Sequence, residues 1–195
     1  MDGALIFNGT SDFASTPDAT GLQSVSVQTV SFWMMPTGLS GAETNRIITD
    51  YTDANDSWAI VEETAGNADF NTIAADMKVA GVDLHLKIAN NSLTPNIMYY
   101  VTAVFANSVP SAIYLNGTSL PLLTPNEGEL GYGTMPRFTI GANNDNSHPF
   151  PGILDEVRIS TIVRSPDWIA TEYNNQANPG SFYNLSGESN AAQLQ

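Results

Sequence analysis

Cysteine is absent from the 195 residues, so the chain has neither a disulfide framework nor thiol chemistry. Basic residues are scarce: 6 Lys and Arg stand against 20 Asp and Glu, which gives a formal net charge of −14. That charge repels phosphate backbones and anionic lipid surfaces, and it argues against nucleic acid as a partner. No run approaches the roughly 20 apolar residues of a membrane helix, so we expect no membrane insertion.

Charged residues make up only 13% of the chain, while the hydrophobic fraction is an ordinary 42%. This composition is typical of a folded domain with a polar, weakly charged surface rather than of a disordered chain. The first residues lack the basic and apolar regions of a signal peptide. We therefore expect either a module of a larger exported protein or a protein that acts without secretion.

Short strand patterns dominate. Residues 82–88 alternate apolar and polar side chains, which is the period of a half-buried strand. Asn116 and Gly117, between two apolar segments, predict a two-residue hairpin turn. Further apolar runs bounded by Gly, Pro, Asn or Asp predict strands over residues 4–7, 25–35, 46–49, 57–61, 98–105, 112–115, 138–140 and 153–159.

One helix is predicted. Ser165 supplies an N-cap, Pro166 suits the first helical position and Asp167 complements the helix dipole. Asn174 and Asn175, together with Pro179, are expected to end this helix. Many short strands with one late helix indicate an all-β fold, a two-sheet antiparallel sandwich with one short C-terminal helix. The sandwich is expected over residues 1–186, with a polar C-terminal tail over residues 187–195.

Several short motifs follow one another along the chain in an order that is characteristic of one fold. Residues 5–13 are an apolar strand, a turn and an aromatic; residues 30–36 carry Phe-Trp before a proline; residues 114–117 read Tyr-Leu-Asn-Gly. Residues 152–159 place a glycine two residues before Asp-Glu-Val-Arg-Ile, and residues 164–176 follow as a helical segment. Together these motifs resemble the laminin-G-like jelly roll of the concanavalin A-like superfamily. Such folds include lectins, hydrolases and structural modules, so the resemblance implies the jelly roll rather than one activity.

Catalysis is not expected. Glycan-cleaving relatives of this fold place carboxylates at every second position of one strand, and hydrolysis needs two carboxyls across the scissile bond. Here Glu62 and Glu63 are adjacent, as are Asp155 and Glu156, so we expect each pair to point to opposite sheet faces. Neither of the two histidines stands beside an obvious nucleophile motif.

The resemblance also implies a calcium site where the first and last strands meet. By this resemblance Asp155 supplies a carboxylate ligand to the ion, and Asn8 and Gly9 supply backbone carbonyl ligands. The alternative is that Asp155 caps a turn or pairs with Arg158. A second candidate is the loop that contains Asp50, Asp53 and Asp56, whose alternative role is a solvated turn.

Sugar binding requires exposed aromatic faces and polar groups that bind hydroxyls. We expect Phe32 and Trp33 in the core and Trp168 at the helix–sandwich contact. Aromatic and polar residues in or beside predicted loops are better candidates, although each of them more often packs its own loop. We therefore predict ligand contacts from Tyr51, Trp58, Asn143, Asn144, Asp145, His148 and Phe150.

Two functions stay open. The first is a non-catalytic, lectin-like binding or adhesion module of a bacterial surface or secreted protein, extracellular, with a glycan or a cell-surface protein as its partner. The second is a structural decoration or fibre protein on the surface of a bacteriophage virion, which needs no signal peptide because virions leave by lysis. A homo-oligomer is compatible with both.

Overall fold

The computed structural model describes residues 3–16, 27–38, 44–51, 57–63, 71–79, 82–106, 111–123 and 138–182. Its strands are β1 (Leu5–Asn8), β2 (Ala14–Ser15), β3 (Val27–Pro36), β4 (Asn45–Tyr51), β5 (Ser57–Glu63), β6 (Thr72–Val79), β7 (Val82–Lys87), β8 (Tyr99–Ala106), β9 (Ala112–Leu115), β10 (Thr118–Leu120), β11 (Thr139–Ile140) and β12 (Pro151–Ser160). Helices α1 (Pro166–Ala177) and α2 (Pro179–Phe182) follow the last strand.

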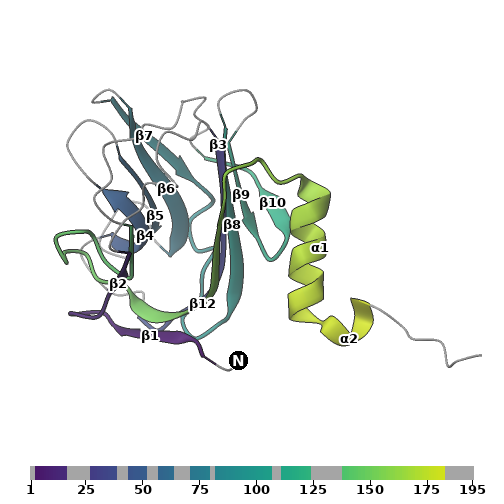
Figure 1. Cartoon of the computed structure of the whole chain (residues 1–195), viewed down its shortest axis with the longest axis horizontal. Helices are drawn as coiled ribbons and strands as arrows, with labels where there is room; N and C mark the ends of the chain where they lie inside the picture. Colours follow the sequence, from purple (N-terminus) through teal and green to yellow (C-terminus); the bar gives the residue numbers. More distant parts are fainter. Residues whose placement is uncertain are drawn as a thin grey trace, which may run out of the picture.

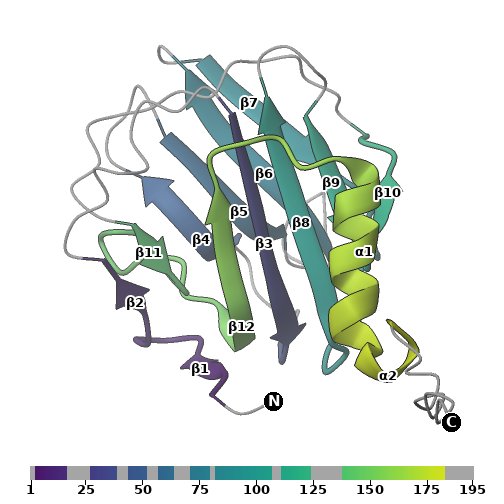
Figure 2. The same ribbon diagram turned by 45° about the vertical axis from the view of Figure 1, so that its right-hand side comes forward.

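The strands form two six-stranded antiparallel sheets that face each other (Figures 1 and 2). Sheet A has the order β1-β12-β3-β8-β9-β10, and sheet B has the order β2-β11-β4-β5-β6-β7. Helix α1 lies against the outer face of sheet A (Figure 2). This arrangement confirms the predicted all-β sandwich with a short C-terminal helix, and it confirms that the first strand pairs with the last.

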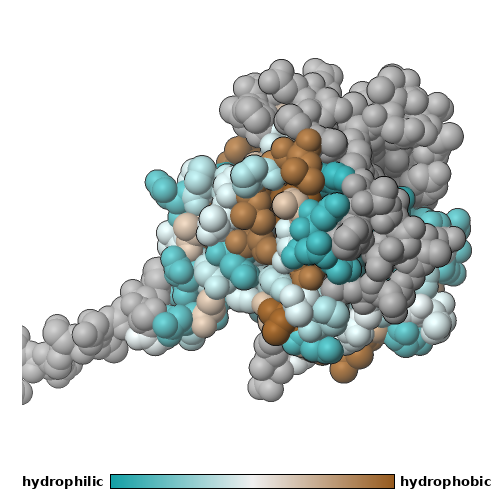
Figure 3. All heavy atoms as spheres, turned by 180° about the vertical axis from the view of Figure 1, so that it is seen from behind, coloured by the Kyte–Doolittle hydropathy of each residue, from teal (hydrophilic) through white to brown (hydrophobic). Residues whose placement is uncertain are grey.

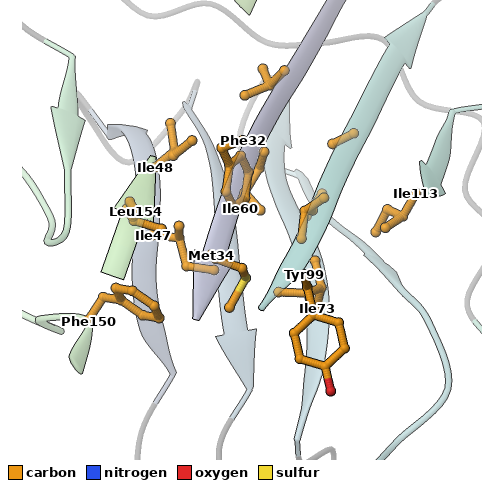
Figure 4. Close-up of a cluster of buried hydrophobic side chains, with 14 of the residues drawn as sticks. Phe32, Met34, Ile47, Ile48, Ile60, Ile73, Tyr99, Ile113, Phe150 and Leu154 are labelled. Carbon is orange, nitrogen blue, oxygen red and sulfur yellow. The ribbon is translucent and has the colours of Figure 1, made fainter. Parts of the chain in front are cut away.

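The core fills the space between the sheets. Along β3, Val30, Phe32 and Met34 expose none of their surface, because alternate side chains of this strand point inward. Figure 4 shows Phe32 and Met34 of β3 among side chains of sheet B, including Ile47 and Ile60. The predicted core position of Phe32 is therefore confirmed.

Strand β8 is buried along its whole length, since both of its faces are covered. Tyr99, Val101 and Phe105 belong to the core between the sheets. On the outer face, Val104 packs with Ile169 of α1 in a separate apolar cluster. A strand this apolar on both sides needs a cover for its outer face, and α1 supplies it.

Two local predictions need correction. The sequence pattern predicts no strand over β6, because this segment contains Ala74 and Ala75, residues with low strand propensity. Pairing with β5 and β7 overrides that propensity, and both alanines are buried. Helix α1 ends at Ala177: of the end signals predicted together, Asn174 and Asn175 lie inside the helix, whereas Pro179 follows it.

The hairpin between β9 and β10 confirms its prediction. Asn116 and Gly117 both have positive φ, 52° and 75°, as a two-residue turn of this type requires. The surface is mainly polar, with scattered apolar residues; Figure 3 shows such a group on the face opposite to that of Figure 1. Large exposed apolar side chains include Ile6, Leu123 and Ile162. Neither described helix is long and apolar enough to cross a membrane.

A candidate binding cleft between helix α1 and strand β12

A β-bulge in β12 shapes the candidate site. The register changes from Asp155 opposite Trp33 to Arg158 opposite Ser31, so three steps on β12 match two steps on β3. Glu156 takes up the extra residue with a φ of 53°, in the left-handed region that is uncommon for glutamate. As a result, Asp155, Glu156 and Arg158 all line one cleft. The prediction that Asp155 and Glu156 point to opposite faces is therefore wrong, because the bulge breaks the alternation.

The cleft lies between β12 and α1 on the outside of sheet A and has a volume of about 570 Å³. This volume falls within the range of small-molecule sites, roughly 300 to 1,000 Å³. Its lining combines one aromatic ring, charged groups and amides: Trp33, Met98, Asp155, Glu156, Arg158, Asn175, Gln176, Ala177 and Pro179. A smaller hollow of about 370 Å³ adjoins it along α1 and shares Arg158, Asn175 and Gln176.

Trp33 forms the aromatic part of the cleft. Its predicted core position is wrong: Phe32 and Met34 on either side point inward, so Trp33 points outward and is half-buried. The ring packs against Tyr100 and Tyr173, with centroid separations of 5.1 and 5.9 Å. Strand alternation was the available signal for this outward position.

Hydrogen bonds fix the Trp33 ring and the wall of the cleft. The Trp33 indole Nε1 donates to Gln176 Oε1 at 2.7 Å. The Tyr100 hydroxyl donates to Glu172 Oε2 at 2.5 Å. Burial, together with this hydrogen bond to Glu172, raises the pKa of Tyr100 to about 12, so the hydroxyl keeps its proton at neutral pH. The helix is thereby joined to β3 and β8 by two polar contacts beneath the cleft.

Arg158 is shared by two carboxylates. It forms an ion pair with Glu156 on its own strand and a second, at 3.4 Å, with Glu172 of α1. The alternative role predicted for Asp155 is that of a capping residue of a turn. Its side chain makes such a local contact, because Asp155 Oδ1 accepts a hydrogen bond from the backbone N–H of Glu156 within the bulge. The cation of the cleft is thus already neutralised, while Asp155 forms no ion pair within the described residues.

Helix α1 begins as predicted. Ser165 is the N-cap, and its hydroxyl accepts from the N–H of Trp168 at 3.2 Å. Ile169 and Tyr173, four residues apart, face the sheet, and Tyr173 packs beside the Gly117 turn. Trp168 lies beside Ile169, as expected for a docking residue, and carries the Arg164 guanidinium 4.3 Å from its ring centre.

The predicted ligand contacts at Trp58 and Phe150 are not supported by their positions. Trp58 is 1% exposed and Phe150 is fully buried. Trp58 points inward from β5 and packs against Phe105 and Phe138, with ring centroids 5.6 and 5.8 Å apart. Both rings are core residues, so neither offers a face to a sugar; flanking polar residues made them look like loop residues.

The predicted polar loop of residues 143–148 binds mainly to itself. The Asn143 amide donates to the Ser147 hydroxyl at 2.9 Å, and Asn144 accepts from the Thr139 hydroxyl. Asp145 accepts from both the hydroxyl and the N–H of Ser147, and these bonds lower its pKa. The carbonyl of His148 accepts from Arg46 N–H at 2.9 Å. The loop is a hydrogen-bonded turn beside the start of β4.

Tyr51 is the last residue of β4, and its side chain lies outside the described part of the structure. The structure describes its backbone and that of Asp50, while Asp53 and Asp56 lie outside the described residues. Of the other predicted ligand residues, Trp58 and Phe150 are thus in the core, and the rest belong to the loop of residues 143–148.

The residues predicted to bind calcium are not brought together. Asn8 pairs with Pro151, four residues before Asp155, a separation of about 13 Å along the strand. Calcium ligands lie about 2.3 to 2.6 Å from the ion, so Asn8, Gly9 and Asp155 do not fit one ion. The described part of the chain also holds no group of three or more His, Asp or Glu side chains placed around one metal. Calcium binding itself stays a prediction.

Comparison with known families agrees with this architecture. Residues 8–170 match the concanavalin A-like lectin/glucanases superfamily, which is most of the chain. The chain belongs to this superfamily. The superfamily match contains Trp33, Asp155, Glu156 and Arg158, whereas Asn175 and Gln176 lie just beyond it. No curated protein sequence matches this superfamily member.

Solved structures share its fold at low sequence identity. The CBM40 domain of Ruminococcus gnavus IT-sialidase, bound to α2,3-sialyllactose, has a TM-score of 0.66 and 11% identity, covering 86% of this chain and 95% of that one. Domain 4 of AbnA, a GH43 arabinanase of Geobacillus stearothermophilus in complex with arabinotriose, has a TM-score of 0.64 and 22% identity, covering 86% and 74%. A receptor-binding domain of botulinum neurotoxin mosaic serotype C/D has a TM-score of 0.68 and 12% identity; this chain, covered to 89%, spans 44% of it.

Proposed function

We propose that this chain is a non-catalytic carbohydrate-binding module whose ligand lies in the cleft between α1 and β12. The observation that carries the proposal is the Trp33 ring, half-buried in the cleft and held by Tyr100, Tyr173 and Gln176. A fixed aromatic ring suits the apolar face of a pyranose or furanose. Membership of a superfamily of lectins and glucanases supports the same class of ligand, as do the similar structures bound to saccharides.

Polar groups around Trp33 suit sugar hydroxyls. The Gln176 carbonyl is occupied by Trp33, but its amide N–H groups make no hydrogen bond within the described residues. Asn175 is exposed at the wall and brings both an amide donor and a carbonyl acceptor. Asp155 adds a carboxylate acceptor. Donors and acceptors thus surround an aromatic surface, the usual composition of a small-molecule site.

A binding role is favoured over hydrolysis because glycoside cleavage uses two carboxyl groups across the scissile bond. Of the described carboxyls that line the cleft and the adjoining hollow, Asp155 alone forms no ion pair. Glu156 is paired with Arg158, and Glu172 is held by Tyr100 and Arg158. Glu62, whose pKa burial raises to about 8, lies in sheet B and does not line the cleft. We expect saccharides that bind to be recovered uncleaved, as chromatography of the incubated ligand would show.

The test is a glycan array followed by calorimetric titration of the saccharides that bind. Trp33→Ala should cost about 1 to 3 kcal/mol of binding free energy, the loss expected for a stacking aromatic. Phe13→Ala is the control, because it removes an exposed aromatic ring that lines neither the cleft nor the adjoining hollow. Circular dichroism and thermal melting report whether each variant stays folded.

Because Trp33 also supports α1, a second variant keeps the proposal falsifiable. Asn175→Ala removes an exposed side chain and should weaken binding without changing the melting temperature. A blank array for the wild-type protein, or equal affinities for wild type and both cleft variants, would overturn the proposal. Extracellular display, a homo-oligomer and a structural role on a virion stay predictions.

A further inference from the structure

The charges of the cleft support an inference about which saccharides it binds, which rests on the proposed function. Three carboxylates, Asp155, Glu156 and Glu172, surround a single guanidinium, Arg158. The guanidinium is bound on both sides, by Glu156 and by Glu172. Counted over their described lining residues, the cleft and the hollow beside it therefore carry a net charge of minus two, and no cation among these residues lacks a carboxylate partner.

The position of Asp155 adds to this charge. Asp155 lies on the strand directly opposite Trp33, on the same outer face of sheet A. Its Oδ1 atom accepts from the Glu156 N–H, which leaves Oδ2 without a hydrogen bond among the described residues. A ligand stacked on Trp33 would meet this free carboxylate oxygen. A sugar hydroxyl or a protonated amine donates to it, whereas a sugar carboxylate or sulfate is repelled.

We infer that the cleft selects saccharides that carry no negative charge, and that Asp155 and Glu156 are the specificity-determining residues that exclude acidic sugars. Electrostatic repulsion of anions, at long range and at contact distance, supports this inference. The whole chain has a net charge of −14, which slows the approach of anions over long distances. Within the cleft, the unpaired carboxylate acts at contact distance, where salt screens it least. Hydroxyl-bearing neutral sugars and amino sugars satisfy Asp155 without this penalty.

The experiment compares matched saccharides that differ in one charged group. Lactose against α2,3-sialyllactose tests an added carboxylate, and a glucosamine oligomer against its N-acetylated form tests an added ammonium; further pairs come from the saccharides that bind on the array. We expect each acidic member to bind at least about tenfold more weakly than its neutral parent. The amine-bearing member should bind at least as well as its neutral counterpart. The discrimination should shrink between 10 mM and 1 M NaCl.

Two isosteric variants assign the selectivity. Asp155→Asn removes the free carboxylate, and Asp155→Asn with Glu156→Gln also releases one side of Arg158. In both variants the ratio of acidic to neutral affinity should rise about tenfold, whatever the change in the affinity for the neutral parent, because only the acidic member carries the repelled charge. Asp167→Asn is the matched control: it removes one charge from an exposed position of α1 that does not line the cleft, and should leave the selectivity unchanged.

The outcomes separate this inference from the proposed function. Binding of acidic sugars as tight as that of their neutral parents would overturn the inference and leave the carbohydrate-binding function standing. Unchanged discrimination in the double variant, or an equal gain in Asp167→Asn, would show that these two residues are not the determinants. If no saccharide binds to the wild-type protein, the proposed function and the inference fall together.

Discussion

At the scale of single residues, burial decides which polar groups have a role in stability. Glu62 lies on the inward face of β5, in line with Trp58 and Ile60, and is fully buried. One carboxyl oxygen accepts from the Asn45 amide at 2.9 Å, and the other has no partner. Burial raises its pKa from 4.5 to about 8, against the smaller lowering by Asn45, so the folded protein keeps this carboxyl protonated at neutral pH.

This residue makes stability depend on pH. Because the folded-state pKa is the higher one, the unfolded chain releases the proton first, and stability falls as pH rises from about 4.5 to about 8. Glu62→Gln removes that dependence, which has a limiting slope of about 1.4 kcal/mol per pH unit. Urea unfolding at several pH values should show the variant more stable than wild type at pH 8 and similar to it at pH 4. Parallel pH profiles for the two proteins would show that Glu62 titrates normally.

At the scale of elements, α1 converts a plain sandwich into one with a walled cleft. Sheet A would otherwise expose the outer faces of β3 and β8, with Trp33, Tyr100 and Val104. Ile169 of the helix covers Val104. Glu172 and Gln176 of the helix form hydrogen bonds with Tyr100 and Trp33, respectively. Its remaining polar residues then form the wall opposite the bulge of β12.

The N-cap of α1 is therefore coupled to the site. Ser165→Ala leaves the N–H of Trp168 without its acceptor and should destabilise the protein by about 1 kcal/mol. Ser165→Asp, which keeps a capping oxygen and adds charge where the helix dipole favours it, should retain the stability. Chemical denaturation measures both variants. Unchanged stability of Ser165→Ala would mean that the cap contributes nothing and that sheet contacts alone hold the helix.

At the scale of the whole molecule, charge opposes compactness. Twenty acidic side chains face six basic ones, so self-repulsion outweighs pairing on this surface. Raising NaCl from 10 to 150 mM shortens the screening length from about 30 to about 8 Å. The melting temperature should rise by a few degrees over this range. A fall in melting temperature would instead show that ion pairs such as Arg158 with Glu172 dominate the electrostatic stability.

The sequence by itself determined the class of fold. Strand alternation, the Asn116-Gly117 turn and the Ser165-Pro166 helix start are local signals, fixed by backbone conformations that few residue types adopt. The ordered motifs also led to the jelly roll, and the superfamily match confirms it. Local signals failed at β6, where neighbouring strands rather than its alanines impose the extended conformation.

Tertiary structure alone decided the site. The position of α1 over sheet A depends on contacts with β3 and β8, where its hydrogen-bond partners Trp33 and Tyr100 lie 143 and 72 positions away in the chain. The bulge that turns Asp155 and Glu156 to one side is a mismatch between two strands, so it is not encoded by either strand alone. Likewise, polar neighbours made Trp58 and Phe150 look exposed, whereas the facing sheet buries them. Periodicity gives a side chain's direction along its own strand, but only packing determines what lies in that direction.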